Sequence, residues 1–198
     1  DEIVLFRHEK AFYHPPGMFF SVSDLWDRER IVAAASRVMK EVFPRVGENL
    51  RFNGLAVRNE SRDPGAFGRA VATIENVAEF PEVLVSESPE ALAAGLARCG
   101  NYRPVIHAAT HENHREVAAL AKRFGCPLVV RAPDLAGLSG LAKACTELGA
   151  PHILLDPAPA NLGEFLERST TIRRKALDRS EPDLGHPVYL DATGMVPE

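Results

Sequence analysis

The chain has 198 residues, 45% of them hydrophobic, and its 23 Lys and Arg against 27 Asp and Glu give a formal net charge of −4. This composition is typical of a soluble globular domain. The negative charge argues against a protein that neutralises nucleic-acid phosphates. No run approaches the roughly 18 apolar residues of a membrane helix, and no signal-peptide pattern opens the sequence. We therefore expect a cytoplasmic protein with neither nucleic acid nor a membrane as a partner.

The three cysteines, Cys99, Cys126 and Cys145, are scattered, at intervals of 27 and 19 residues. None belongs to a CxxC motif, so a zinc site or an iron–sulfur cluster held by this chain alone is not expected. An odd number of cysteines without a secretion signal favours reduced thiols. We expect them to serve as small apolar core residues.

The most informative pattern is a repeated unit in which a short apolar run ends in polar residues and a helical stretch follows. Runs of consecutive Val, Ile and Leu are typical of strands covered on both faces, so they predict a parallel sheet. The six runs are residues 54–59, 82–87, 103–110, 127–131, 152–157 and 187–191.

Helices are predicted between these runs, which is the alternation of a βα protein. The clearest helical segments are residues 89–97, 113–124, 134–148 and 162–177. The third of these closes at Gly149, which suits the left-handed residue after a helix, and the fourth carries basic residues near its end, where they favour the helix dipole. Ahead of the first run, Ser23 or Asp24 is expected to cap a long helix that continues to Phe43 with Leu25 on its apolar face.

The beginning of the chain is less regular. Residues 3–7 and 18–22 are both candidate strands joined by a turn-rich segment, which predicts an N-terminal hairpin. The two strands of a hairpin are antiparallel, so at most one of them can belong to a parallel barrel. We therefore divide the chain into a hairpin segment, residues 1–22, and a βα-barrel domain, residues 23–198.

About seven parallel strands fit either an open doubly wound sheet or a (β/α)8 TIM barrel. An open sheet usually binds phosphates at a glycine-rich first loop, and the sequence contains neither GxGxxG nor GxxxxGK[ST]. Polar residues follow nearly every predicted strand, which suits the mouth of a barrel better. Because a complete barrel typically needs about 250 residues, we predict an α/β TIM-barrel type that lacks its last βα unit.

The polar residues at the predicted strand ends are the candidate ligand-binding groups, because a barrel brings them together at one mouth. From the whole set of strand-end residues, which also includes Arg58 and Arg131, six are chosen as contacts that line the mouth: Asn59, Ser86, Thr110, Asn113, Asp156 and Asp191. The alternative is that such residues only cap the following helices, a role that would suit Ser88, Asn113 and Asp134. No catalytic residue can be named, since the sequence contains no nucleophile motif and no specific pair of carboxylates.

Three histidines, His107, His111 and His114, lie close together in the sequence and raise the question of a metal site. His107 falls inside a predicted strand, whereas His111 and His114 lie on either side of a helix start, so the three need not face one point. We therefore expect exposed or capping histidines and no metal. A proton-transfer role for His8 is an alternative without further support.

Several segments resemble one protein family. Residues 6–15, FRHEKAFYHP, are similar to the FRHEKTF signature of the large (gamma) subunit of the corrinoid iron–sulfur protein. That protein belongs to the acetyl-CoA decarbonylase/synthase (CO dehydrogenase/acetyl-CoA synthase) system. The same pattern continues through RVGE at 45–48, PVIHAAT at 104–110 with Asn113, LDP at 155–157 and IRR at 172–174. The resemblance covers essentially all 198 residues.

The resemblance implies a TIM barrel that lies between two other domains, one holding a [4Fe–4S] cluster and one holding a cobamide. Both cofactors would be held outside this chain. The complete protein of the family carries a methyl group from a methyltetrahydropterin to acetyl-CoA synthase, with the barrel shielding the corrin and docking partners. The implied partners are a small subunit, which forms a heterodimer with the large one, a methyltransferase, and acetyl-CoA synthase/CO dehydrogenase. The chain alone is not expected to be catalytic.

Two departures from the family pattern stand out. Position 158 is Ala where the family commonly has DPG, so the backbone freedom of that glycine is absent. Position 111 is His where the pattern does not require it.

Two other functions stay open: a stand-alone pterin-binding methyltransferase that uses Asn59, Asn113 and Asp156, and a non-catalytic scaffold barrel whose open edge pairs with a partner.

Overall fold

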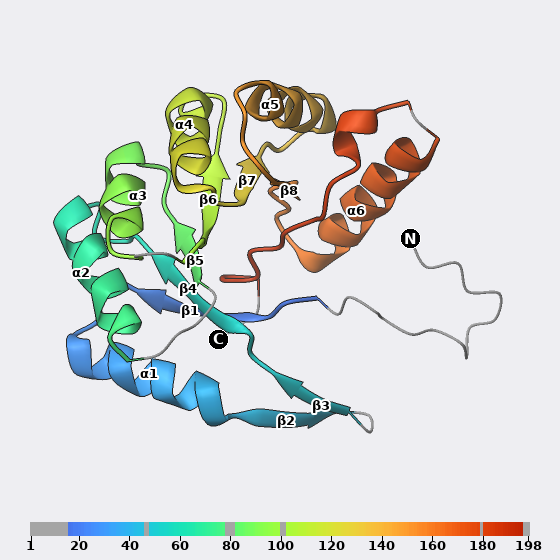
Figure 1. Ribbon diagram of the computed structural model, residues 1–198. Helices are drawn as coiled ribbons and strands as arrows, with labels where there is room; N and C mark the ends of the chain where they lie inside the picture. Colours follow the sequence, from blue (N-terminus) through green and yellow to red (C-terminus); the bar gives the residue numbers. More distant parts are fainter. Residues whose placement is uncertain (1–15, 46–47, 78–81, 100–101, 179, 196–198) are drawn as a thin grey trace.

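The computed structural model describes residues 16–45, 48–77, 82–99, 102–178 and 180–195. Strands form the inside of the molecule and helices form an arc around them (Figure 1). The strands are β1 (Phe19–Ser23), β2 (Val42–Arg45), β3 (Glu48–Arg51), β4 (Gly54–Arg58), β5 (Glu82–Val85), β6 (Val105–Ala109), β7 (Leu128–Arg131) and β8 (Ile153–Asp156). The helices are α1 (Arg28–Lys40), α2 (Pro64–Glu75), α3 (Pro89–Leu96), α4 (His114–Phe124), α5 (Leu135–Glu147) and α6 (Leu162–Leu177), followed by a 3-10 turn, η2 (Pro182–Leu184).

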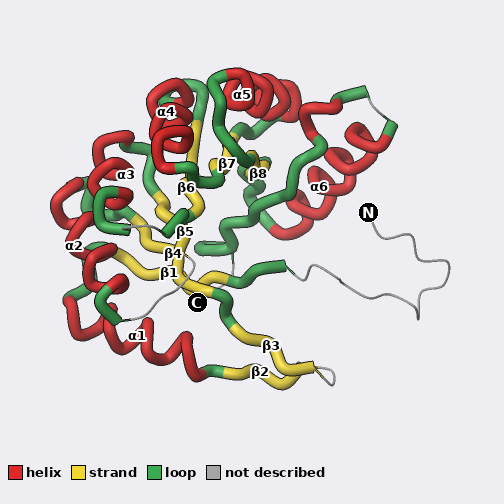
Figure 2. The backbone as a smooth tube through the Cα atoms, in the orientation of Figure 1, coloured by secondary structure: helices red, strands yellow, loops and turns green. Residues whose placement is uncertain are grey.

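The main sheet has six parallel strands in the order β1-β4-β5-β6-β7-β8. Each strand lies beside the next strand of the sheet along the chain, and the connecting helices cover its outer side (Figure 2). A doubly wound sheet reverses its strand order at a switch point, and this sheet has none between β1 and β8. The winding in one direction is that of a TIM barrel, as predicted.

The last of the six predicted strand runs extends the barrel only weakly. Val188 forms a single parallel bridge with Leu155 of β8. The Leu155 amide donates to the Pro187 carbonyl, and the Tyr189 amide donates to the Leu155 carbonyl, both at 2.8 Å. With this segment counted, seven parallel strand positions are filled in the described part of the chain.

Helix α1 is shorter than predicted at both ends. Asp27, not Ser23 or Asp24, is the N-cap, and its carboxylate accepts from the Arg30 amide at 2.8 Å. Ser23 still belongs to β1, and Leu25 is 66% exposed instead of lying on an apolar helix face. The helix ends at Lys40, before Val42, Phe43 and Pro44, because the first two favour a strand and proline has no amide hydrogen to continue a helix.

A hairpin that was not predicted follows α1. Strands β2 and β3 pair antiparallel, with Phe43 opposite Leu50, and project away from the barrel (Figure 1). The ring of Phe52 packs edge-on against Phe43 at 5.3 Å and against Phe20 of β1 at 5.6 Å, and this contact joins the hairpin to the barrel.

Of the two runs of the predicted N-terminal hairpin, residues 3–7 lie outside the described residues. The second run takes part in the barrel, because Phe19–Ser23 pairs parallel with β4. The division of the chain at residues 22 and 23 stays a prediction.

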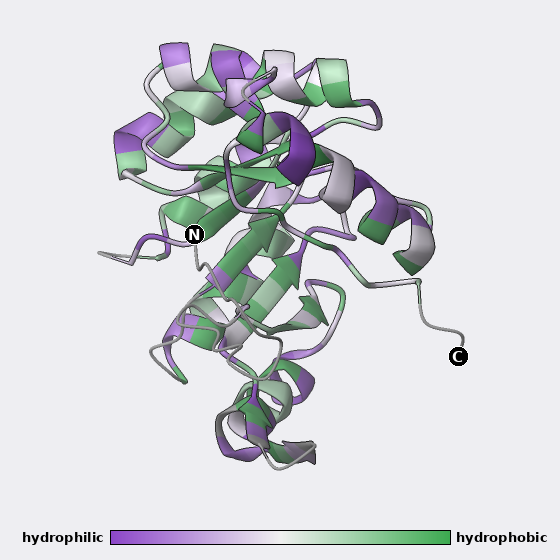
Figure 3. Cartoon of the chain, turned by 90° about the vertical axis from the view of Figure 1, so that its right-hand side faces the viewer, coloured by the Kyte–Doolittle hydropathy of each residue, from purple (hydrophilic) through white to green (hydrophobic). Residues whose placement is uncertain are grey.

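The core has two parts because alternate residues of each barrel strand face opposite sides. Leu55, Leu84, Ile106, Leu128 and Leu155 belong to the large cluster that packs against the helices. A smaller cluster inside the barrel contains Ala56, Val83 and Val85, with Phe19, Val105 and Tyr189 packed against it. Figure 3 shows the resulting hydrophobic strands and the hydrophilic outer sides of the helices.

The other predicted helices are confirmed within a residue or two. Ser88 and Asp134 cap α3 and α5, accepting from Ala91 at 3.2 Å and Gly137 at 2.7 Å. Gly149 follows α5 with a φ of 92°, which a glycine adopts without strain. None of the helices in the described residues has the length and apolar character of a membrane span.

Candidate functional site

A cleft of about 410 Å³ opens at the carboxyl ends of the barrel strands. A second hollow of about 240 Å³ adjoins it and shares Arg58, Arg131 and Asp191 with it. Together they form the barrel mouth, the place where TIM barrels carry ligand sites. The main side chains of the mouth cleft are Arg58, Asn59, Ser86, His107, Arg131 and Asp191.

A buried hydrogen bond between His107 and Asp156 lies at the floor of the mouth. The two atoms, Nε2 and Oδ2, are 2.9 Å apart, and both side chains are at most 3% exposed. His107 is two residues beyond Val105 on β6, so it faces the barrel interior as Val105 does. The rings of His107 and Tyr189 lie 4.9 Å apart, so the imidazole is held from two sides.

Arg131 connects this pair to the rim of the mouth. Its Nε lies 3.5 Å from the Asp156 carboxylate, and its NH1 lies 3.7 Å from Glu87. Arg131 and Asp156 are partners in the β7–β8 register, which explains their proximity. Arg131 is 40% exposed, so part of its guanidinium is available to a ligand while its charge is balanced within the site.

Arg58 forms a second ion pair on the other side of the mouth. Its NH1 donates to Asp191 at 2.6 Å, which links β4 to the segment after η2. Burial acts to raise the pKa of Asp191, but hydrogen bonds from Arg58 and Thr193 outweigh it and hold this pKa below its usual value. Burial, with the nearby Asp191 and Asp156 carboxylates, raises the pKa of Tyr189, so this phenol stays protonated.

Asn59 and Ser86 belong to a polar network at the edge of the cleft. Ser86 donates to the Asn59 side-chain oxygen at 3.1 Å, and the Asn59 amide donates to Asp24 at 2.8 Å. Asp24 also accepts from the Glu60 and Ser61 amides at 2.9 Å. This use of Asp24 in the loop after β4 is the physical reason why it does not cap α1.

Four of the six predicted contacts lie at the mouth: Asn59, Ser86, Asp156 and Asp191. Thr110 and Asn113 lie outside its lining. The Asn113 side chain accepts from the Thr110 amide at 2.7 Å and donates to the Glu87 and Ala108 carbonyls at 2.8 and 3.2 Å. Asn113 therefore holds the loops after β5 and β6 together, and it does not cap α4 with its side chain.

Of the main side chains of the mouth cleft, three were not among the six predicted contacts: Arg58, His107 and Arg131. Arg58 and Arg131 are the last residues of their strands. Residues two apart in a strand lie on the same face, so Arg131 lies on the face of Val129, just as Asp156 lies on the face of Leu154. His107 is hidden in the sequence because it precedes two alanines of the same strand. The alternation from Val105 is the signal that could have revealed it.

Ala158 begins the loop after β8 with a φ of 47°, in the left-handed region that favours glycine. Its amide donates to the Asp156 carboxylate at 2.8 Å. The tight turn therefore holds the acceptor of the His107 hydrogen bond in place.

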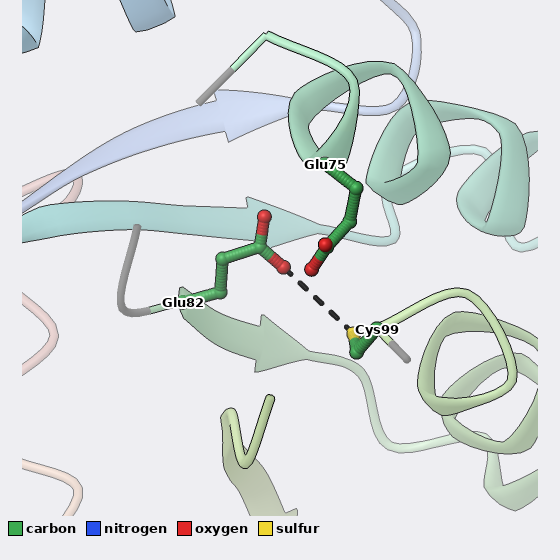
Figure 4. Close-up of side chains that lie close together, drawn as sticks. All are labelled: Glu75, Glu82 and Cys99. Carbon is green, nitrogen blue, oxygen red and sulfur yellow. Dashed lines mark hydrogen bonds between the residues drawn. The ribbon is translucent and has the colours of Figure 1, made fainter. Parts of the chain in front are cut away.

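A separate cluster lies at the opposite end of the barrel (Figure 4). Glu75 from the end of α2, Glu82 from the start of β5 and Cys99 after α3 have ligand atoms within 4.8 Å of one another. Burial, followed by the nearby Glu75 carboxylate, raises the pKa of Glu82 to about 8. The Cys99 thiol donates to Glu82 at 3.9 Å, and its own pKa is raised by burial and by Glu82. At neutral pH the Glu82 carboxyl and the Cys99 thiol are therefore largely protonated.

The chain's own residues do not fit a [4Fe–4S] cluster. Such a cluster needs four thiolates, and the chain has three cysteines, all buried as free thiols. Burial also raises the pKa values of Cys126 and Cys145 to about 11. The histidines do not gather at one point either: Nε2 of His107 bonds Asp156, and Nδ1 of His114 lies 3.0 Å from the His111 carbonyl. His8 lies outside the described residues.

The mouth also does not enclose a cobamide. Its two hollows have the volumes of small-ligand pockets, below the size of a corrin ring with its nucleotide. What the mouth offers is a set of fixed donors and acceptors with paired charges, which suits a polar molecule or the polar edge of a larger one.

Comparison with known proteins agrees with the resemblance seen in the sequence. Residues 1–195 match the family described as CO dehydrogenase/acetyl-CoA synthase delta subunit. The chain is 32% identical over 197 residues to the corrinoid/iron-sulfur protein large subunit of Moorella thermoacetica, an alignment that covers 100% of the chain and 44% of that protein. It is 33% identical over 189 residues to the acetyl-CoA decarbonylase/synthase complex subunit gamma of Methanothermobacter thermautotrophicus, which covers 93% of the chain and 41% of that protein.

Among solved structures, dihydropteroate synthase from Thermus thermophilus in complex with 6HMPPP has the same fold. The TM-score is 0.61 at 22% identity, over 87% of the chain and 70% of that protein. The chain spans less than half the length of the two curated relatives. Since the family match covers nearly every residue, the chain belongs to the CO dehydrogenase/acetyl-CoA synthase delta subunit family.

Proposed function

We propose that the chain is the barrel part of a corrinoid iron–sulfur methyl carrier of the cytoplasm. This carrier takes a methyl group from a methyltetrahydropterin and passes it to acetyl-CoA synthase. The observation that supports this most directly is the 32% identity, over 197 residues, to the large subunit of a corrinoid/iron-sulfur protein. In this proposal the cobamide and the [4Fe–4S] cluster are held by other domains, and the partners are a small subunit, a methyltransferase and acetyl-CoA synthase/CO dehydrogenase.

The cobalt of a cobamide supplies the methyl-accepting and methyl-donating chemistry. The barrel contributes a fixed polar surface at its mouth. Arg58 and Arg131 are partly exposed and can donate to amide or carboxylate oxygens, while Asp191 and Asp156 hold them in place. His107 is held by Asp156 and Tyr189, so the floor of the mouth is braced before a partner or cofactor domain approaches.

The test uses the full reading frame that contains these residues, produced with cobamide and purified together with the small subunit. We expect a corrin absorption band and methyl transfer from methyltetrahydrofolate when the methyltransferase is added. The double variant Arg58→Met/Arg131→Met should lower the transfer rate at least tenfold while the corrin band stays. The control is Arg115→Met/Arg123→Met, which removes two exposed arginines of α4 away from the mouth.

The absence of a corrin band in the full protein with its small subunit would contradict the proposed function. A corrin band with full transfer by the Arg58→Met/Arg131→Met variant would leave the function standing and would contradict the role of the mouth. The two results are therefore distinguishable.

A second candidate, a pterin-binding methyltransferase barrel, is favoured by the position of Asn59 and Asp156 at the mouth and by the size of the cleft. The third residue expected for this function, Asn113, is engaged in a loop. Calorimetry with methyltetrahydrofolate checks it: micromolar binding by the chain alone supports this candidate, and no binding at millimolar ligand contradicts it.

A further inference from the structure

Apart from the mouth, a groove of about 630 Å³ opens on the outside of the barrel. It lies between α1 and α2, with Arg98 after α3 at its far side, and these three helices lie side by side in Figure 1. We call it the α1–α2 groove and define it by six of its lining residues: Trp26, Arg28, Ile31, Arg69, Ala70 and Arg98.

The first part of α2 gives the α1–α2 groove a shallow, mainly apolar floor, because Ala66, Gly68, Ala70 and Ala72 line it, while Thr73 and Asn76 add polar groups toward the end of the helix. The buried Ile31 and the half-buried Trp26 close its α1 side. A second hollow of about 330 Å³ on the α3 side of α2 shares Gly68 and Arg98 with it. The small side chains of α2 therefore leave shallow, apolar surface on the sides of this helix that face α1 and α3, and a helix of another protein can pack there.

The rim of the α1–α2 groove is basic, although the chain as a whole is acidic. Arg28, Arg69 and Arg98 come from three different segments and are exposed. Within the described residues, Arg28 and Arg98 form no ion pair, and Arg69 makes only an exposed contact of 3.7 Å with Asp63. Asp24 is the acidic residue of the lining, and its carboxylate is already used by Asn59 and the loop after β4.

The helix starts near the α1–α2 groove already use amides that a phosphate site would need. The Gly65 and Ala66 amides at the start of α2 donate to Asp63, and the Arg30 amide donates to Asp27. A phosphate site built on a helix N-terminus needs those amides.

The combination of an apolar floor with separate arginines suits a ligand with an apolar face and several carboxylates. Trp and Arg are also the residue types that dominate binding energy at protein interfaces.

We propose that the α1–α2 groove docks an acidic amphipathic helix of a partner protein. Apolar side chains of that helix would lie over the small residues of α2, and its carboxylates would pair with Arg28, Arg69 and Arg98. The site lies on the outer helix layer, so the inference goes beyond the methyl-carrier function and does not depend on it.

Trp26 makes the proposal directly measurable, because it is the single tryptophan of the chain and lies in the groove under the Arg30 guanidinium, 4.0 Å from its ring centre. The probe is a designed amphipathic peptide of roughly 15 residues, long enough to form a helix on binding, with Leu and Ala on one face and Glu on the other. We expect micromolar binding that changes the Trp26 fluorescence and weakens as salt is added.

The triple variant R28E/R69E/R98E should weaken peptide binding at least tenfold. The matched control R115E/R123E/R174E makes the same change in charge at exposed arginines of α4 and α6 and should bind like the unmodified protein. A peptide with Lys in place of Glu, and an acidic peptide of the same composition with a scrambled order, should each bind at least tenfold more weakly. Circular dichroism verifies that both variants fold.

Equal binding by R28E/R69E/R98E and the control, equal binding of the scrambled peptide, or binding without a change in Trp26 fluorescence would each overturn the proposal. So would the absence of binding at millimolar peptide. Vesicles of anionic phospholipid and single-stranded DNA are titrated in parallel. Binding of either one that depends on the three arginines, without peptide binding, would assign the groove to a different class of partner.

Discussion

Ala158 has a backbone conformation that its side chain disfavours. A non-glycine residue in the left-handed region costs about 1–2 kcal/mol, and the φ of Ala158 is 47°. The resemblance to the family had already marked this position, because the family commonly has glycine after the Asp-Pro pair. The structure adds the reason: the turn presents the Ala158 amide to Asp156.

Replacing Ala158 with glycine should therefore stabilise the fold. Glycine also loses more conformational freedom on folding, so the net gain in the free energy of unfolding is expected to be about 0.5–1 kcal/mol. Chemical denaturation of Ala158→Gly measures it. Ala160→Gly is the control, since Ala160 lies in the same loop without a positive φ, and it should be neutral or destabilising. A loss of stability in Ala158→Gly would contradict the strain assigned to this residue.

At the scale of single residues, part of the mouth could be predicted from the sequence. Asp156 and Asp191 follow parallel strands, and parallel strands bring their carboxyl ends to one edge, so their positions follow from the strand pattern alone. Asn113 could not be predicted in the same way. Its side chain reaches back to the Glu87 and Ala108 carbonyls, a choice between hydrogen bonds that spacing does not encode.

At the scale of elements, the buried hydrogen bond between His107 and Asp156 joins β6 to β8 across β7. Removing one partner of a buried polar pair leaves the other without its hydrogen bond. We expect Asp156→Ala to lower the free energy of unfolding by about 2–4 kcal/mol. In a double-mutant cycle with His107→Ala, the coupling energy should reach about 1 kcal/mol or more.

Asp191→Ala is the matched control for that measurement. Asp191 also pairs with an arginine at the mouth, but its side chain is 20% exposed, so its loss should cost less, about 1 kcal/mol. Strictly additive effects of Asp156→Ala and His107→Ala would show that the two side chains do not act as a pair.

Helices and strands could be predicted where the local sequence pattern favours the same element that packing in the barrel requires. From residue 54 onward, strands β4 to β8 follow closely from strong apolar runs, and α3 to α6 were predicted to within a residue or two, whereas α2 was not among the predicted helices. The hairpin of β2 and β3 was missed because the apolar residues Val42 and Phe43 continue the spacing of α1. Pro44 was the sign that the helix could not continue through this segment.

At the scale of the whole molecule, stability should depend on pH through Glu82. Its pKa of about 8 in the fold lies above the usual 4.5, so the folded protein binds more protons than the unfolded chain between these values. The free energy of unfolding should therefore fall, by on the order of 2 kcal/mol, as the pH rises from about 5 to 8. Asp191, whose pKa is lowered, acts only in acid and lies outside this range. Burial lowers the pKa of His186 from 6.5, so this residue opposes the fall at the acid end of the range, and the Glu82 contribution is the difference between the two proteins with and without Glu82.

Urea denaturation at several pH values measures this dependence. Glu82→Gln keeps the shape of the side chain without its titration and should flatten the profile between pH 5 and 8. Glu90→Gln is the control, because hydrogen bonds lower the pKa of the exposed Glu90 and keep its titration below this range. An unchanged slope in Glu82→Gln would refute the assignment.

The order of the strands has a consequence for how the chain acquires its structure during synthesis. From β5 to β8 each strand pairs with the one made just before it, so the sheet can grow in the direction of translation without waiting for distant segments. Side-chain contacts at the mouth are an exception, since the partner of His107, Asp156, is made 49 residues later, and the partner of Arg58, Asp191, is made 133 residues later. The nascent barrel must therefore hold an unpaired imidazole until β8 leaves the ribosome, and the mouth is the last part of the described sheet to be completed.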